Sequence, residues 1–168
     1  MRILGLDPGS LNTGFGVIEC HGGAVRAITA GRRSARPGVP LAERLLRLAD
    51  ELEALIRREG PERAAVEKPF HGVNSRSAIV LAEARGALLV TLARAGLPIV
   101  EFAPAEVKSA VAGNGRADKT QVARMVALQL RLGGERLTPD ASDALAIALC
   151  AAQRLGRELL VARSEAAK

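Results

Sequence analysis

The chain has 168 residues, 48% of them hydrophobic and 25% charged, which is the balance of a single soluble globular domain. No apolar run reaches the ~18 residues of a membrane span, and the N-terminus lacks a signal-peptide pattern, so we expect a cytoplasmic protein. The net charge of +6 suits a polyanionic partner such as nucleic acid, although an arginine-rich genome would produce the same excess. Aromatic residues make up only 2%, which argues against a broad stacking platform for single strands.

The N-terminal stretch Met1 to Val17, with the sequence MRILGLDPGSLNTGFGV, is the most informative part of the chain. A short apolar run ends on Asp7, and Pro8 and Gly9 then force a turn. Glycines at positions 5, 9, 14 and 16 leave the backbone around this acid almost bare, so a metal ion or a phosphate could approach it. An aspartate before Pro-Gly is also a common turn former, and the stretch alone does not separate these two interpretations.

Two further strands are predicted directly after this turn. Thr13 to Cys20 has the pattern of a second strand and Ala24 to Thr29 that of a third, with a tight connection between them. Short connections favour antiparallel pairing of these strands with the first apolar run. The segment from Arg32 to Pro40 is rich in Arg, Pro and Gly and is predicted to be a loop.

The middle of the chain alternates between helix and strand patterns. Leucines at positions 41, 45, 48, 52 and 55 mark one face of an amphipathic helix, which Gly60 and Pro61 end. Short apolar strands are predicted at Arg63 to Glu67 and at Ile99 to Phe102, with a helix from Ala78 to Ala95 between them.

Three helices are predicted after the last strand. The first begins near Pro104, the second follows a cap at Asp118 and runs to about Leu132, and the third begins at Pro139. This order of elements predicts an α/β fold with a five-stranded mixed sheet, three antiparallel strands followed by two parallel ones, flanked by helices. We expect one domain over residues 1–157 and a frayed tail over residues 158–168.

Four carboxylates on three of these elements could converge. Asp7 and Glu67 both end apolar strands, so in a parallel pair they emerge at the same edge of the sheet. Asp140 and Asp143 share one face in the first turn of the last helix. Each acid also has an ordinary explanation, as a turn former, a solvated strand end or a helix-start acid. Asp143 is the hardest to explain in this way, because its segment Ala141 to Ala152 is otherwise almost wholly apolar.

A cluster of four carboxylates indicates bound divalent cations. Ligands that are all oxygen favour Mg²⁺, with Mn²⁺ as a substitute, over zinc. Two such ions about 4 Å apart activate a water and stabilise the leaving oxygen of a phosphodiester. Asp7 would bridge the two ions because its strand lies between the other acids. The predicted chemistry is phosphodiester hydrolysis without a covalent intermediate.

Five segments in this order resemble the RuvC family of Holliday-junction resolvases: GLDPGSLNTGFGVIE, AVEKPF, AEARG, VKSAVAGNGRADKTQV and PDASDALAIA. The resemblance covers about residues 1–153. It implies a ribonuclease H-like fold and a homodimer that binds four-way DNA junctions in recombination and repair. Such dimers nick two opposed strands and leave 5′-phosphate and 3′-hydroxyl ends. The resemblance also implies a link to the RuvA–RuvB branch-migration complex.

Carried over position by position, the family's catalytic, metal-binding acids fall on Asp7, Glu67, Asp140 and Asp143. Its two important lysines match Lys108 and Lys119, which we expect to contact DNA phosphates or to stabilise charge in the transition state. A solvated helix lysine is the ordinary interpretation of each.

The resemblance also suggests residues for DNA binding and for dimer formation. Phe70 matches the family's aromatic residue in the loop after the second acid, where it could stack on an unpaired base. Weaker candidates for contacts with the DNA backbone are Asn74, Arg76 and Arg85. Small or apolar residues suited to a closely packed dimer helix are Ala82, Gly86 and Leu89. Lys68-Pro69 departs from the Gln-rich sequence expected at this place and would stiffen the loop.

Two other functions compete with junction cleavage. An actin-like or sugar-kinase-like ATP-binding fold also opens with a strand and a glycine-rich acidic turn, but it repeats that unit in a second lobe for which this chain is too short. A catalytically inactive junction-binding protein is the other alternative, and the presence of all four acids argues against it.

Overall fold

The protein is described from a computed structural model, which covers residues 1–9, 11–34, 38–68, 75–133 and 137–166. Its centre is one five-stranded sheet in the order β3-β2-β1-β4-β5. The strands are β1 (Arg2–Asp7), β2 (Asn12–His21), β3 (Ala24–Ser34), β4 (Arg63–Glu67) and β5 (Ile99–Phe102). β1, β2 and β3 pair antiparallel, whereas β4 pairs parallel with both β1 and β5. The predicted mixed sheet is therefore confirmed.

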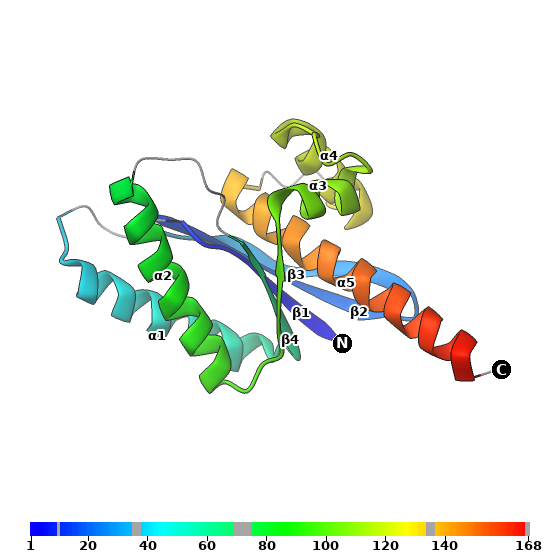
Figure 1. Cartoon of the computed structure of the whole chain (residues 1–168), viewed down its shortest axis with the longest axis horizontal. Helices are drawn as coiled ribbons and strands as arrows, with labels where there is room; N and C mark the ends of the chain where they lie inside the picture. The colour runs from blue at the N-terminus through cyan, green and yellow to red at the C-terminus, as the bar shows by residue number, and fades with distance from the viewer. Residues whose placement is uncertain (10, 35–37, 69–74, 134–136, 167–168) are drawn as a thin grey trace.

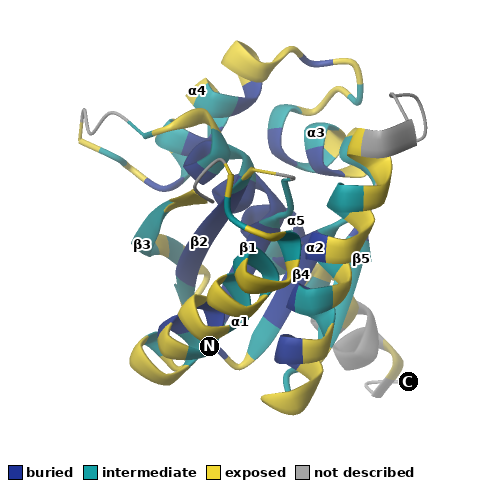
Figure 2. Cartoon of the chain, turned by 90° about the vertical axis from the view of Figure 1, so that its left-hand side faces the viewer, coloured by how far each residue is buried: buried dark blue, intermediate teal, exposed yellow. Residues whose placement is uncertain are grey.

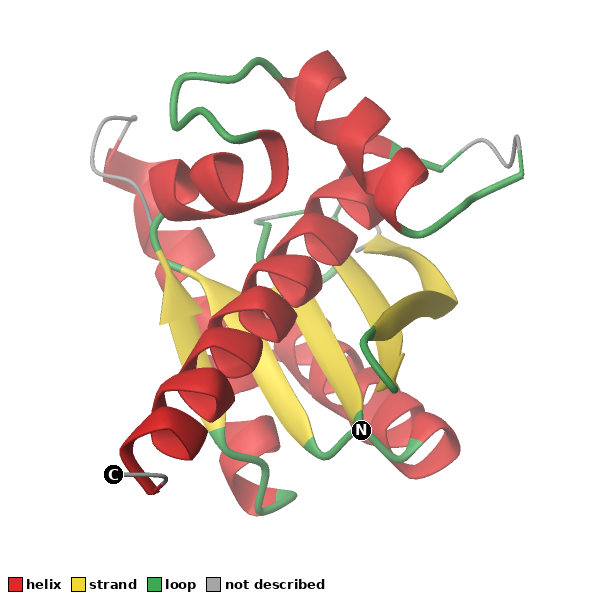
Figure 3. Ribbon diagram, turned by 90° about the vertical axis from the view of Figure 1, so that its right-hand side faces the viewer, coloured by secondary structure: helices red, strands yellow, loops and turns green. Residues whose placement is uncertain are grey.

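Helices cover both faces of this sheet (Figure 1). They are α1 (Leu41–Glu59), α2 (Ser75–Arg94), α3 (Pro104–Ala112), α4 (Lys119–Gln129) and α5 (Pro139–Ala166). α5 crosses one face of the sheet diagonally, with α3 and α4 beside its N-terminal half, while α1 and α2 lie on the other face (Figure 3). None of the described helices is both long and apolar enough to cross a lipid bilayer.

The alternation of residues along β1 divides the protein into two cores. Ile3 belongs to the core beneath α3, α4 and α5, whereas Leu4 and Leu6 belong to the core beneath α1 and α2. Successive side chains of a strand point to opposite faces of the sheet. Asp7, two positions after Gly5 and four after Ile3, therefore lies on the α5 face. Figure 2 shows the buried strands between helices whose outer surfaces are exposed.

Local signals end and begin the helices as the sequence predicts. Gly60 adopts a left-handed φ of 57° and its backbone N–H donates to the Ile56 carbonyl, which ends α1. Asp118 caps α4, because its Oδ1 accepts a 2.8 Å hydrogen bond from the Gln121 backbone N–H. The Gln121 side chain accepts in return from the Asp118 backbone N–H, which completes a capping box.

Several element ends differ from the expectation, including that of α2, which begins at Ser75 rather than Ala78. β3 continues to Ser34, so the interpretation of the segment from Arg32 as loop is wrong: its pairing with β2 continues to Asn12↔Ser34, where Ser34 Oγ donates to Asn12 Oδ1 over 2.7 Å. Composition had indicated a loop, but cross-strand pairing overrides it. α4 ends at Gln129, earlier than the predicted Leu132, and α5 stays helical to Ala166, past the expected end near Arg157.

Candidate active site

Three carboxylates and two lysines from separate elements line one cavity of about 380 Å³ at the carboxyl ends of β1 and β4. The acids are Asp7, Glu67 and Asp143, and the lysines are Lys108 and Lys119. The remaining lining is mostly apolar and comes from α3, α4 and α5: Pro104, Val107, Val122 and Ala146. Five of the six residues predicted for catalysis therefore share this cavity.

Strand pairing brings the first two acids together. β1 and β4 pair in parallel with Leu6 opposite Val66, so the next residue of each strand, Asp7 and Glu67, lies at the same edge of the sheet. Ala65 belongs to the core beneath α5, and Glu67, two positions later, faces the same side. The prediction that these two acids emerge together is confirmed.

The two aspartates of α5 take different partners. Asp143 Oδ2 accepts a 2.9 Å hydrogen bond from Lys119 Nζ and faces the cavity. Asp140 lies one turn earlier and pairs with Arg32 on β3, with its Oδ2 3.8 Å from the guanidinium Nη1. Asp140 is therefore next to the cavity rather than in its lining, and it is the one predicted acid that the structure places outside it.

The converging acids change one another's ionisation. Burial, followed by the charges of Glu67 and Asp143, raises the pKa of Asp7 to about 7, while Lys119 lowers it and Asp140 raises it slightly. Burial and the charge of Asp143 also raise the pKa of Glu67, against the opposing effect of the two lysines. Without a cation beside them, these acids cannot all be ionised at low cost, so the cavity attracts positive charge.

Lys119 supplies part of the positive charge that offsets these acids. The hydrogen bond to Asp143 and its charge raise the pKa of Lys119, so this side chain is a lasting cation beside the acids. Lys119 is the first residue of α4 and its side chain is 80% exposed, which leaves its ammonium group reachable from solvent. In the positions that the structure gives them, no three His, Cys, Asp or Glu side chains of the described residues form a ready metal cage.

The glycines have a different role from the expected one. A Cβ atom added to Gly5 would overlap the backbone carbonyl of Ala144, and one added to Gly14 would overlap the carbonyl of Asp140. A Cβ on Gly9 would meet the Asn12 carbonyl of the same turn. The interpretation of these glycines as clearance for metal and DNA is therefore wrong for Gly5 and Gly14, because α5 fills that space.

Arg32 is a site neighbour that the sequence analysis missed. Asp7 pairs with Gly14 and Gly14 pairs with Arg32, so the three residues form one row across β1, β2 and β3 on the α5 face. Asp140 lies over the middle of this row, above Gly14, and its carboxylate reaches Arg32. Two consecutive arginines next to Ser34 are compatible with an edge strand, and that was the available signal.

Arg85 makes contacts within the protein. Its Nη2 donates to the Glu101 carboxylate, and its Nε donates to the Glu67 backbone carbonyl over 3.4 Å. The guanidinium thus ties α2 to the ends of β4 and β5, directly behind one of the site acids. A contact of Arg85 with DNA stays a prediction.

The remaining predicted residues lie on α2 or in the segment before it. Phe70 and Asn74 lie outside the described residues, as does the side chain of Arg76. Ala82 and Gly86 are exposed and Leu89 is half-buried. A Cβ on Gly86 would meet nothing within 4 Å, so the helix surface there is open.

Known proteins resemble this chain over most of its length. The family described as crossover junction endodeoxyribonuclease RuvC matches residues 3–151. The protein of that name from Chloroflexus aggregans is 47% identical over 150 residues, which cover 89% of this chain and 92% of the relative. The one from Halorhodospira halophila is 46% identical over 167 residues, which cover 98% of each chain.

A solved structure shares the fold. T. thermophilus RuvC in complex with a Holliday junction substrate is 35% identical, with a TM-score of 0.86 over 93% of this chain and 96% of that one. The ribonuclease H-like architecture is thus the same. The chain therefore belongs to the RuvC family of crossover junction endodeoxyribonucleases.

Proposed function

We propose that this protein resolves four-way DNA junctions by cutting phosphodiester bonds in the cavity lined by Asp7, Glu67 and Asp143. The observation that carries the proposal is the meeting of these three carboxylates, from β1, β4 and α5, with two lysines in one cavity of a RuvC-family chain. The relatives described above are crossover junction endodeoxyribonucleases by name, and one solved neighbour is in complex with a Holliday junction. Neither an ATP-binding function nor a loss of catalysis finds support in these comparisons.

The cavity suits divalent cations, and we infer Mg²⁺, with Mn²⁺ as a substitute, at two ions per site. The fit rests on the oxygen-only donors and on the raised pKa values of Asp7 and Glu67, because bound cations would offset the burial and the mutual repulsion of these acids. Asp7, Glu67 and Asp143 would hold the ions, with Asp140 joining when its carboxylate leaves Arg32. When bound, such ions supply a nucleophilic water and stabilise charge on the phosphate oxygens.

The protein's own groups position the DNA strand. Lys108 and Lys119 line the cavity from α3 and α4, and Lys119 contacts Asp143 directly, so a phosphate bound there would meet lysine charge beside the acids. Lysine ammonium groups bind phosphate oxygens as compact point charges and stabilise the additional negative charge of the transition state. The apolar wall formed by Val107 and Val122 reduces water in the cavity and so strengthens these interactions.

We also propose a homodimer that uses the outer face of α2. Ile79 is 60% exposed and Val90 is 53% exposed, and the small residues Ala82 and Gly86 lie between them on the helix surface. Exposed apolar residues at spacings of three and four form a stripe that another apolar surface can cover. Two active sites in one dimer would account for paired nicks, which leave 5′-phosphate and 3′-hydroxyl ends.

Further parts of the proposal concern the segment between β4 and α2 and the cellular setting. Phe70 and Asn74 follow Glu67, which lines the cavity, by three and seven residues in the sequence. We propose that Phe70 stacks on an unpaired base at the junction centre, and that Asn74 and Arg76 contact the DNA backbone. A cytoplasmic location and cooperation with the RuvA–RuvB branch-migration complex follow from the same proposed role.

The deciding assay offers the purified protein a synthetic four-way junction and a linear duplex of matching sequence, with Mg²⁺, Mn²⁺ or EDTA. We expect cutting of the junction alone, in the presence of metal alone, at symmetry-related positions in two opposed strands. Equal cutting of the linear duplex, or any cutting in EDTA, would contradict the proposal.

Single-residue variants, tested in the same assay, identify which residues belong to the active site. Asp7→Asn should reduce the cutting rate by a factor of at least about 10³ while junction binding is retained, because it removes a charge that holds the metal. Asp50→Asn is the matched control, since Asp50 lies exposed on α1. Phe70→Ala should slow cutting with the fold intact. Unchanged cutting by the Asp7 variant would remove that residue from the site.

A further inference from the structure

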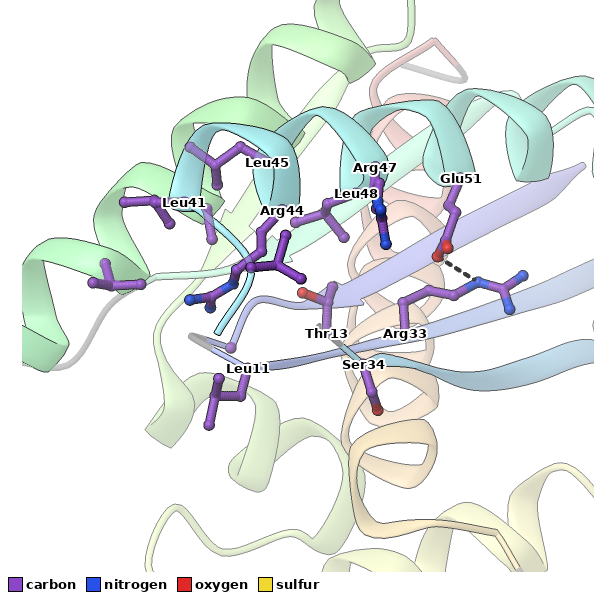
Figure 4. A pocket seen from close by; sticks show the side chains of 14 residues that line it. Leu11, Thr13, Arg33, Ser34, Leu41, Arg44, Leu45, Arg47, Leu48 and Glu51 are labelled. Carbon is purple, nitrogen blue, oxygen red and sulfur yellow. Dashed lines mark ion pairs between the residues drawn. The ribbon is translucent and has the colours of Figure 1, made fainter. Parts of the chain in front are cut away.

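A second cavity, of about 310 Å³, lies on the face of the sheet opposite α5, between the β1–β2 turn, the end of β3 and helices α1 and α2 (Figure 4). Three arginines line it: Arg33 on β3, and Arg44 and Arg47 on α1. Glu51 is the acid among its described lining residues, so three positive charges meet one negative charge. We call this cavity the arginine pocket.

Arg33 pairs with the acid of the pocket. Arg33 Nε lies 3.2 Å from Glu51 Oε2, drawn as the dashed line in Figure 4, and its guanidinium lies 5.1 Å above the Phe15 ring. Arg47 is exposed and forms no ion pair with any residue in the described ranges. Arg44 lies one helical turn before Arg47, so the two side chains leave α1 on the same side. Arg47 therefore adds a positive charge to the pocket that Glu51, already paired with Arg33, does not cancel.

The arginine pocket lies at the same end of the sheet as the active site, on the opposite face. Gly9 and Thr13 line it, and they flank the turn that follows Asp7. At the end of β3 two consecutive arginines point to opposite faces: Arg32 pairs with Asp140 beside the active site, whereas Arg33 enters the arginine pocket. A polyanion that crosses the end of the sheet would thus meet positive charge on both faces.

The lining indicates what kind of anion fits. Leucines and valines from α1, α2 and the turn form much of the wall, including Leu11, Leu45, Leu48 and Val80. Free phosphate would leave such walls unused, but a deoxyribose with its phosphate presents an apolar ring face beside a charged group. We propose that the arginine pocket binds a sugar–phosphate unit of the junction DNA away from the bond that is cut. This inference rests on the proposed function.

The first test measures binding of a synthetic four-way junction over a range of salt concentrations. Arg47→Gln should weaken binding roughly three- to tenfold at about 0.1 M salt and lower the slope of log Kd against log salt by about one, as for the loss of one phosphate contact. Arg57→Gln is the control: it removes the same charge from the same helix, but Arg57 lies outside the pocket, where it pairs with Glu53. We expect its slope to match that of the unmodified protein.

The second test predicts an increase in affinity for junction DNA. Glu51→Gln removes the negative charge of the arginine pocket, so junction binding should tighten by roughly two- to fivefold and depend more steeply on salt. Glu53→Gln, on the same helix but outside the pocket, should bind no more tightly than the unmodified protein. A gain in affinity cannot arise from a damaged fold, so this variant keeps the proposal testable if Arg47→Gln is unstable.

The outcomes separate the two proposals. If the unmodified protein cuts no junctions, the proposed function fails. If it does cut them, but Arg47→Gln matches Arg57→Gln and Glu51→Gln matches Glu53→Gln, the arginine pocket is not a DNA site. Thermal stabilisation by inorganic pyrophosphate that Arg47→Gln abolishes, with junction binding unchanged, would instead assign the pocket to a small anion and overturn the inference.

Discussion

Asp7 carries an electrostatic cost in the metal-free protein. Its pKa rises from 3.8 to about 7, so between these two pH values the folded protein keeps a proton that the unfolded chain releases. The stability contributed by the protonated form is fully present below about pH 4 and is lost as the pH rises through 7. Above that pH the ionised carboxylate destabilises the folded state relative to a neutral side chain.

Asp7→Asn should therefore raise the free energy of unfolding by about 1–3 kcal/mol at pH 8 in EDTA, because asparagine stays neutral. The difference in unfolding free energy between the variant and the unmodified protein should narrow as the pH falls to 5.5. Urea denaturation at both pH values measures it, with Asp50→Asn as a control that shows no such gap. Mg²⁺ should stabilise the unmodified protein more than the variant. A gap that widens towards acid pH would contradict the raised pKa.

The sequence predicted the individual site residues unevenly. Asp7 and Glu67 were predictable because each is the polar end of an apolar strand, and parallel pairing leaves such ends together. The different partners of Asp140 and Asp143 were not predictable, because they depend on how far α5 is rotated on the sheet. Arg32 was missed because local composition carries no information about the strand that pairs with it.

At the scale of elements, the contact between α5 and the sheet depends on two glycines, which have no side chain to keep the helix away. Gly5 and Gly14 lie under the backbone carbonyls of Ala144 and Asp140, so α5 approaches β1 and β2 more closely than side chains would permit. The depth of this contact sets where Asp140 and Asp143 stand relative to Asp7. These glycines are thus positioning residues for the acids.

Gly14→Ala should push the first turn of α5 away from the sheet, since the new methyl group meets backbone rather than a movable side chain. We expect a loss of about 1–3 kcal/mol of stability and a fall of at least about tenfold in cutting rate at a temperature where the variant is folded. Gly156→Ala is the control within α5, because a Cβ there meets nothing within 4 Å. That variant should keep its activity and gain up to about 1 kcal/mol.

Binding of Mg²⁺ to the folded Gly14→Ala variant, measured by thermal shift, distinguishes displaced acids, which bind the ion more weakly, from a simple loss of stability. Normal metal binding and normal cutting by this variant would contradict the positioning role of Gly14.

The elements themselves were predictable, since leucine spacing marked α1, and Asp118 and Pro139 marked helix starts. The end of β3 was not, because its pairing with β2 is a long-range interaction that composition does not record.

At the scale of the molecule, the proposed dimer predicts a defined oligomeric state. Ile79→Glu places a charge on the apolar stripe of α2 and should convert the dimer into a monomer, as measured by light scattering during size-exclusion chromatography. Leu128→Glu is a closely matched control, because Leu128 on α4 is 61% exposed and Ile79 is 60% exposed. Dissociation by both variants, or by neither, would contradict an interface on α2.

β1 presents alternate residues to two unrelated sets of neighbours. Gly5 and Asp7 face α5 and the candidate active site, whereas Leu4 and Leu6 pack in the core that supports α2. Substitutions at neighbouring positions of the two sets share one backbone segment, so their free-energy effects are expected to couple rather than add. The six residues of β1 thus support two proposed properties at once, cutting through Asp7 and subunit association through the core beneath α2.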